Sequence, residues 1–288
     1  MLWFSLALLT AIFSATEAAW LKKRFSDLGF LEMAAFPFPY ALPLLGLGCL
    51  LLPRPALGLE FWLWLALLLP LNGAGFLLQI RAIHLSPLSL TMPFLAFTPV
   101  FVILTGWLLL GEQLNLPGIA GVAAITAGGF VLGRERADDP ILAPLRRLVR
   151  ERGPLYMLGA ALVFSLTSVI GKKLILLSSP LFFACLFFFC FGCLLLTGLT
   201  AMKRIRLRKL LSRPRDGVVA ALLLCGHIAC HQLALSMTKT AYMMAIKRLN
   251  GLFSVGLGWI WFKETGIRFR LTGAALMTAG AAIIALWG

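Results

Sequence analysis

Two short stretches decide the fold, "GWLLLGE" at 106–112 and "GWIWFKE" at 258–264. Each closes a run of apolar residues, and the Gly, Trp and Glu positions of the two stretches differ by the same 152 residues. The offset also relates "TAG" at 126–128 to "TAG" at 278–280. Spaced identities at one offset indicate that the chain contains a duplicated unit.

The starts of the two copies agree at almost the same offset. "FSAT" at 13–16 matches "FSLT" at 164–167, a separation of 151 residues. The chain is therefore divided into a first repeat at 1–133, a basic linker at 134–154 and a second repeat at 155–288. The centre of the linker is basic and partly amphipathic, so we expect a helix lying on the membrane surface there.

The composition places these repeats in a membrane. Of 288 residues, 60% are hydrophobic and only 13% are charged, whereas soluble chains are about half apolar and a quarter charged. Since a bilayer offers backbone groups no partners, apolar runs of about 20 residues predict an all-α membrane protein. Ten transmembrane helices are predicted, at 2–21, 30–52, 60–82, 88–110, 114–133, 155–176, 180–201, 217–237, 240–262 and 271–287.

Five helices per repeat have a geometric consequence. An odd number means that the second repeat enters the membrane upside down relative to the first. Two inverted five-helix repeats are typical of alternating-access transporters, whose substrate site lies near the bilayer midplane between the repeats.

The net charge of +15 lies mostly in short connections. The connections after the odd-numbered predicted helices hold 20 Lys and Arg, and those after the even-numbered helices hold 4. The positive-inside rule then predicts a multi-pass protein of the cytoplasmic (inner) membrane with both termini outside. This distribution favours membrane lipid over nucleic acid as the partner of the basic residues.

The repeat unit resembles the EamA domain of the drug/metabolite transporter superfamily. The resemblance lies in an apolar helix followed by "GE" or "KE" and then by a Gly-rich helix with "TAGG" or "TAGA". It covers nearly the whole chain as two copies, and Pro93 and Pro99 stand where the family commonly has a proline. It implies ten helices, secondary transport or exchange, and a central cavity. The ninth helix departs from the pattern, with Gly251 at the position of Pro99.

Lys247 and Arg248 stand side by side within the ninth predicted helix. A charge inside a bilayer is costly unless it is paired, hydrated or snorkelled. On one continuous helix the two side chains point about 100° apart, so we expect one to face the cavity and the other a neighbouring helix. Asn250 and Ser254 share the face of Lys247 and complete a polar stripe suited to an anion. An internal ion pair or a snorkelled lysine is the structural alternative.

Acidic residues form the second group of candidates. Glu17 lies three residues after Ser14 in the first helix. It is interpreted as a proton-coupling carboxylate or the counter-ion of a helix-nine cation, or else as a hydrated residue near the interface. Glu112 and Glu264 end apolar helices, where a carboxylate caps the next helix or pairs with a loop cation.

The eighth helix supplies His227 and His231, four residues apart on one face. Gln79 matches His231 at the offset of 152, which favours a central position for both. With no carboxylate or cysteine set beside the two histidines, no metal site is predicted. The aromatic run at 182–193 is expected to face lipid or the bundle surface. The absence of a catalytic motif or phosphate-binding loop predicts neither an enzyme nor a cofactor.

Three functions remain open from the sequence. The leading one is a secondary transporter of a small anionic or zwitterionic metabolite, working with a coupling proton or a counter-substrate. A second is a proton-coupled exporter of organic cations or drugs that uses Glu17. A third is a carrier of lipid-linked intermediates, or a membrane partner that transports nothing.

Overall fold

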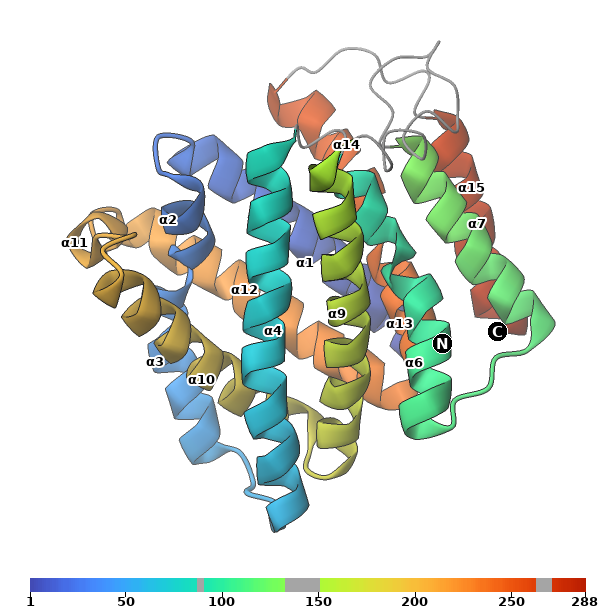
Figure 1. Cartoon of the computed structure of the whole chain (residues 1–288), viewed down its shortest axis with the longest axis horizontal. Helices are drawn as coiled ribbons and strands as arrows, with labels where there is room; N and C mark the ends of the chain where they lie inside the picture. The colour runs from blue at the N-terminus through green and yellow to red at the C-terminus, as the bar shows by residue number, and fades with distance from the viewer. Residues whose placement is uncertain (87–90, 133–150, 263–270) are drawn as a thin grey trace.

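The computed structural model describes residues 1–86, 91–132, 151–262 and 271–288. Its regular elements within these ranges are all helices (Figure 1). The first half contains α1 (Leu2–Phe25), α2 (Phe30–Ala35), α3 (Phe38–Leu51), α4 (Leu59–Leu85), η1 (Met92–Phe97), α6 (Thr98–Leu110) and α7 (Leu116–Leu132). The second contains α9 (Arg152–Leu176), α10 (Pro180–Ala201), α11 (Leu207–Leu210), α12 (Pro214–Met237), α13 (Thr240–Lys247), α14 (Asn250–Phe262) and α15 (Leu271–Trp287).

The described residues confirm the all-α prediction. Six helical segments are long and apolar enough to cross a membrane. Three shorter apolar helices span 94–110, 116–132 and 272–287. The predicted surface helix of the linker and the predicted cap Glu264 lie outside the described residues.

The structure interrupts two helices that were predicted to be continuous, and the third, at 88–110, contains the 3-10 helix η1 at Met92–Phe97. The segment 30–52 divides into α2 and α3 around Pro37, because proline lacks the N–H that would continue the ladder. The segment 240–262 divides into α13 and α14 without any proline. There the N–H groups of Arg248 and Leu249 donate to carbonyls only three residues back, at 2.9 and 3.0 Å. This pattern is a short 3-10 turn.

The interruption falls at the same place in both halves. The 3-10 helix η1 ends at Phe97, and the turn between α13 and α14 ends at Leu249, 152 residues later. The helices that follow begin at the equivalent residues Thr98 and Asn250. The break therefore belongs to the repeat unit, and proline is only one way of making it.

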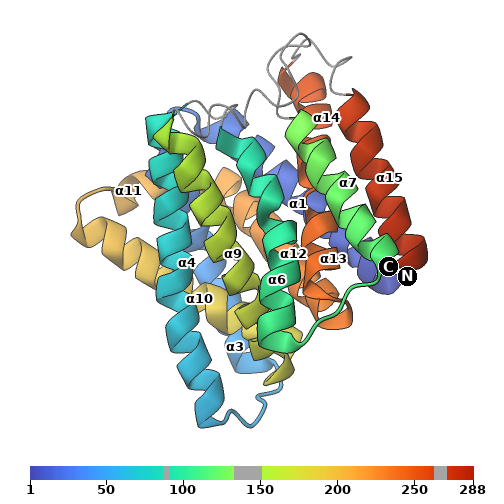
Figure 2. The ribbon, with the colours of Figure 1, turned by 45° about the vertical axis from the view of Figure 1, so that its right-hand side comes forward.

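The helices α7 and α15 lie side by side (Figure 2), and glycines bring their backbones into contact. A Cβ on Gly128 would lie 2.6 Å from the carbonyl oxygen of Gly273, and a Cβ on Gly280 equally far from that of Gly121. Early residues of α7 thus meet late residues of α15, so the two helices run antiparallel. The two contacts are equivalent in the duplication, because Gly273 and Gly280 lie 152 residues after Gly121 and Gly128.

The other helix pairs repeat this reciprocity. Phe164 on α9 packs against Gly75 on α4, and Phe13 on α1 packs against Gly226 on α12. The two phenylalanines differ by 151 residues, and so do the two glycines. The first helix of each half therefore packs on the third long helix of the other half.

One ionic network, here called the Glu112 network, ties the halves together at one end. The Glu112 carboxylate accepts hydrogen bonds from Lys172 Nζ at 2.5 Å and from the Thr240 backbone N–H at 2.8 Å. Lys172 Nζ also donates to the carbonyl oxygen of Thr238 at 2.6 Å. Glu112 thus caps a helix as predicted, but it caps α13 rather than α7, which follows it in sequence.

The Glu112 network offers a test with a matched control next to it. The Lys172 and Glu112 side chains are 12% and 9% exposed, whereas the neighbouring pair of Lys173 and Glu60 is 28% and 55% exposed. Breaking a buried pair costs about 3–5 kcal/mol, and breaking an exposed pair about 0–1 kcal/mol. Lys172→Met should therefore lower the melting temperature in detergent by on the order of 10 °C. Lys173→Met should leave it nearly unchanged, and equal losses would contradict the assigned difference.

The backbone contact between α7 and α15 gives a second prediction. Gly128→Ala places a methyl group against the backbone of α15, so we expect it to cost about 1–3 kcal/mol. Gly256→Ala is the control, because a Cβ at Gly256 on α14 meets nothing within 4 Å. Removing a helical glycine there should be neutral or stabilising. Thermal unfolding of both variants, monitored by circular dichroism, measures the difference, and a neutral Gly128→Ala would refute the close approach.

Candidate functional site

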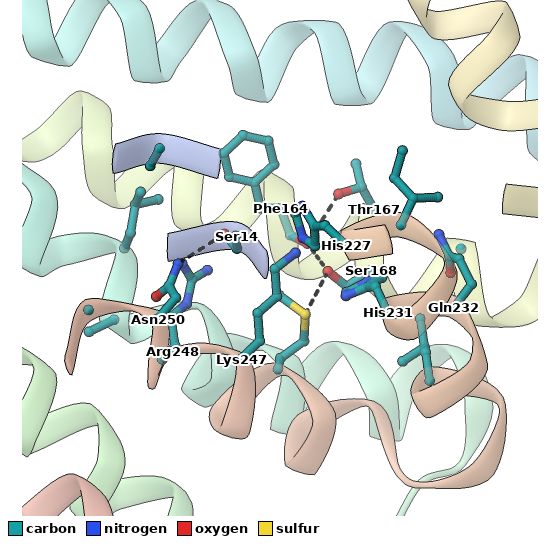
Figure 3. Close-up of a pocket in the computed structure, with 18 of the residues that line it drawn as sticks. Ser14, Phe164, Thr167, Ser168, His227, His231, Gln232, Lys247, Arg248 and Asn250 are labelled. Atoms are coloured by element: carbon teal, nitrogen blue, oxygen red, sulfur yellow. Dashed lines mark hydrogen bonds between the residues drawn. The ribbon is translucent and has the colours of Figure 1, made fainter. Parts of the chain in front are cut away.

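A cavity of about 700 Å³ lies between the two halves of the chain. It is lined from α1, α4, α7, α9, α10, α12, α13, α14 and α15 and from the η1 segment. Eight of the nine predicted site residues line it: Ser14, Gln79, His227, His231, Lys247, Arg248, Asn250 and Ser254. Figure 3 shows six of these eight gathered at the same cavity.

The ninth predicted residue, Glu17, is not among the residues that line the cavity. Its Oε2 is 3.3 Å from Nδ1 of His227, which does line the cavity. The interaction joins α1 to α12. The carboxylate is therefore held by a histidine, and it is not one of the residues that line the cavity.

The turn between α13 and α14 alters the expected placement of the two cations. Both Lys247 and Arg248 line the cavity, although one of them was expected to face only a neighbouring helix. The 100° separation applies to a continuous helix, and α13 ends at Lys247. Asn250 and Ser254 also reach the cavity, but they do so from α14, so the predicted stripe is not one helical face.

Arg248 is oriented by the opposite half of the chain. Its Nη2 donates to Oγ1 of Thr98 at 2.8 Å, and the Thr98 hydroxyl donates in turn to the carbonyl oxygen of Leu95 at 2.7 Å. Thr98 is fully buried at the start of α6. Arg248 Nε has no hydrogen-bond partner among the described atoms. The guanidinium is thus fixed on one side, with donor capacity left unused.

Lys247 lacks the hydrogen bond that fixes two other interior cations, since Lys172 donates to Glu112 and Arg248 donates to Thr98. Within the described ranges Lys247 makes no hydrogen bond and no ion pair within 4.0 Å. The carboxylate that acts on it electrostatically, Glu17, is in hydrogen-bond contact with His227. The ammonium group therefore faces the cavity without a fixed counter-ion in contact.

Sequence reasoning missed several residues that line the cavity. Gln232 follows the predicted His231 directly, and Phe164 begins the "FSLT" stretch. The aromatic run was expected to face lipid or the bundle surface, but its Phe183 and Phe187 are buried and line the cavity. The two rings stack with centroids 5.7 Å apart. A run that is apolar on all sides gives no periodic signal of which ring faces inward.

The contact between Arg248 and Thr98 gives a third prediction. Thr98→Val keeps the shape of the side chain but removes the acceptor of a charged donor, which we expect to cost about 1.5–3 kcal/mol. Thr98→Ser keeps the hydroxyl and should retain most of the stability. Thermal unfolding of the two purified variants compares them directly. If valine and serine behave alike, the hydroxyl does not hold the guanidinium.

The fold and the cavity define a class: a multi-pass helical membrane protein with a charged central cavity between two homologous halves. A sequence model of the EamA-like transporter family matches residues 1–134 and again residues 151–286. The chain belongs to this family, and thus to the drug/metabolite transporter superfamily. A solved structure titled only "Crystal structure of protein" has the same fold, with a TM-score of 0.70 and 19% identity. The match covers 98% of this chain and 96% of that chain.

Curated relatives match over shorter stretches. An "Uncharacterized transporter in cobO 3'region" of Sinorhizobium sp. is 41% identical over 71 residues, which is 25% of this chain and 50% of the relative. A "Probable 4-amino-4-deoxy-L-arabinose-phosphoundecaprenol flippase subunit ArnE" of Yersinia pestis is 42% identical over 65 residues. That match covers 23% of this chain and 57% of the relative. The chain thus spans only about half the length of these relatives.

Proposed function

We propose that this chain is a secondary transporter of a small anionic or zwitterionic metabolite. The observation that carries the proposal is the pair of cations at the cavity. Lys247 has no acidic partner in contact, and Arg248 Nε has no acceptor among the described residues. A charge held inside a bilayer without a partner is expensive, and such residues mark substrate pathways. A carboxylate or phosphate on the substrate supplies the missing partner.

Alternating access of two inverted five-helix repeats is the proposed mechanism. Ten membrane crossings in two domains, 1–133 and 155–288 with the linker 134–154 between them, accord with the antiparallel contact of α7 and α15. The glycine contacts between these two helices, and that of α4 with α9, have equivalents in which the two halves trade places, at offsets of 151 or 152 residues, as an inverted duplication requires. The substrate then lies between the repeats, and rocking of one repeat against the other exposes it to each side in turn.

We propose that the cavity in this structure opens toward the basic connections, which are those that follow the odd-numbered predicted helices. Two lining residues, Ala18 and Ser254, are exposed, and both lie beyond the midpoint of their membrane segments on the way to those connections. The Glu112 network lies just past the end of α6 and at the start of α13, at the connections opposite to the basic ones. If the basic connections face the cytoplasm of a cell with an inner membrane, this state faces inward and both termini lie outside.

A carrier of lipid-linked intermediates is the second candidate, favoured by the name of the Yersinia relative as a flippase subunit. A cavity of about 700 Å³ falls within the range for small-molecule sites. It suits a polar head group with a phosphate, and a long lipid chain would have to remain outside it in the membrane. The cation-exporter alternative has weaker support, because Glu17 is not a lining residue of the cavity and its carboxylate is in contact with His227.

Uptake into proteoliposomes tests the proposal. A panel of labelled organic anions, zwitterions and cations of metabolite size is offered to the wild type and to Lys247→Ala and Arg248→Ala. Loss of one charge-assisted hydrogen bond costs about 1.5–3 kcal/mol, so we expect the apparent affinity for the transported anion to fall about 10- to 100-fold.

Glu17→Gln separates the alternatives in the same assay. If cations are preferred and their uptake is abolished only by Glu17→Gln, the protein is a cation exporter and the anion-transporter proposal is refuted. If the uptake of anions is unchanged in both Lys247→Ala and Arg248→Ala, the proposed anion site is refuted. Transfer of a fluorescent phospho-lipid between leaflets, with no uptake of soluble anions, supports the lipid carrier instead.

A further inference from the structure

We propose that the substrate carries a hydroxyl or amino group at the end away from its anionic group, and that Gln232 recognises this group. The inference rests on the proposed function, since it places the anion at Lys247 and Arg248. It adds a second point of recognition and thereby narrows the class of substrate. Gln232 becomes the residue that determines specificity within organic anions.

The Gln232 side chain is buried and lines the cavity without a partner. The residue is 5% exposed, and its Oε1 has no hydrogen-bond partner in the part of the chain that the structure describes. Buried side-chain amides are normally hydrogen-bonded, because an unpaired one carries the full cost of desolvation. Nδ1 of the adjacent His231 lies buried at the same cavity and is also unpartnered. Two neighbouring unsatisfied groups indicate a place prepared for a polar part of the ligand.

These two residues lie apart from the cationic end of the cavity. Figure 3 places Arg248, Asn250 and Ser14 on one side of the view and Gln232 with His231 on the other. Lys247 and Ser168 lie between the two groups. The Ser168 hydroxyl donates to the carbonyl oxygen of Phe164 at 2.7 Å. A ligand whose anionic group meets the guanidinium therefore reaches Gln232 with its opposite end.

The cavity lining also includes apolar side chains, which suit an apolar part of the ligand. Phe183 and Phe187 stack along α10, and Leu68 and Leu235 line the same cavity. Such a lining with a few placed polar groups is the usual form of a small-molecule site. An amide presents both an acceptor and donors, so a hydroxyl group on the ligand can satisfy it in either orientation. The inferred substrate is an organic anion with an apolar middle and a distal hydroxyl or amino group.

A pair of probes that differ by one hydroxyl tests the inference. Binding of 3-phenylpropionate and 3-(4-hydroxyphenyl)propionate to the full chain in detergent is measured by titration calorimetry. A site built to bond a hydroxyl discriminates strongly against an analogue that lacks it. We expect the wild type to prefer the hydroxylated probe at least 10-fold. Gln232→Leu should reduce that preference to within about threefold.

Two controls make each outcome informative. Gln113→Leu makes the same chemical change at an exposed residue outside the cavity lining, so it should keep the preference of the wild type. Lys247→Ala should lower the affinity for both probes by the same factor and leave the ratio of the two affinities unchanged. If the wild type binds both probes equally, or if Gln232→Leu keeps the preference, the second recognition point is refuted while the anion site stands. If neither probe binds, or Lys247→Ala weakens neither, the proposed function itself fails.

Discussion

The lipid bilayer supplies no hydrogen-bond partner and no counter-charge, and this constraint governs the whole molecule. It forces the backbone into helices. Where a helix is interrupted, the backbone N–H groups must still find acceptors, as they do in the 3-10 turn at Arg248 and Leu249. The same constraint also explains why interior charges are accompanied by built contacts. Glu112 has Lys172 and the start of α13, Glu17 has His227, and Arg248 has Thr98. Lys247 is the cation at the cavity that has no such contact.

The sequence predicted the duplication well because the offset is carried by residues that make contacts. Four glycines make the contacts across the antiparallel pair of α7 and α15: Gly121, Gly128, Gly273 and Gly280. The spacing of these glycines in the sequence therefore reflects how the two helices pack. The candidate site was predicted through the cost of burying charge and polarity. That reasoning needs only the position of a residue along an apolar run, and it led to eight residues that line one cavity.

Prediction failed where neighbours rather than the local sequence decide the outcome. The turn after Lys247 has no proline to announce it, and the only local hint is the equivalence of Gly251 with Pro99. Gln232 carries no charge, so the reasoning from the cost of buried charge did not select it. Its importance follows from being buried without a partner. The phenylalanines of α10 are apolar on every side, so their inward-facing members could not be chosen from the sequence.

The Glu112 network has an energetic consequence because the duplication does not repeat all of it. At the offset of 151, the residue that matches Lys172 is Leu21. The lysine that holds one end of the molecule thus has an aliphatic counterpart in the other half. If the chain works by the alternating access proposed above, its two access states are built from unequal halves and differ in free energy, so the unloaded protein has a preferred resting state. Under that mechanism, the asymmetry between the copies contributes to which face the empty protein presents, and to how much binding energy the change of state requires.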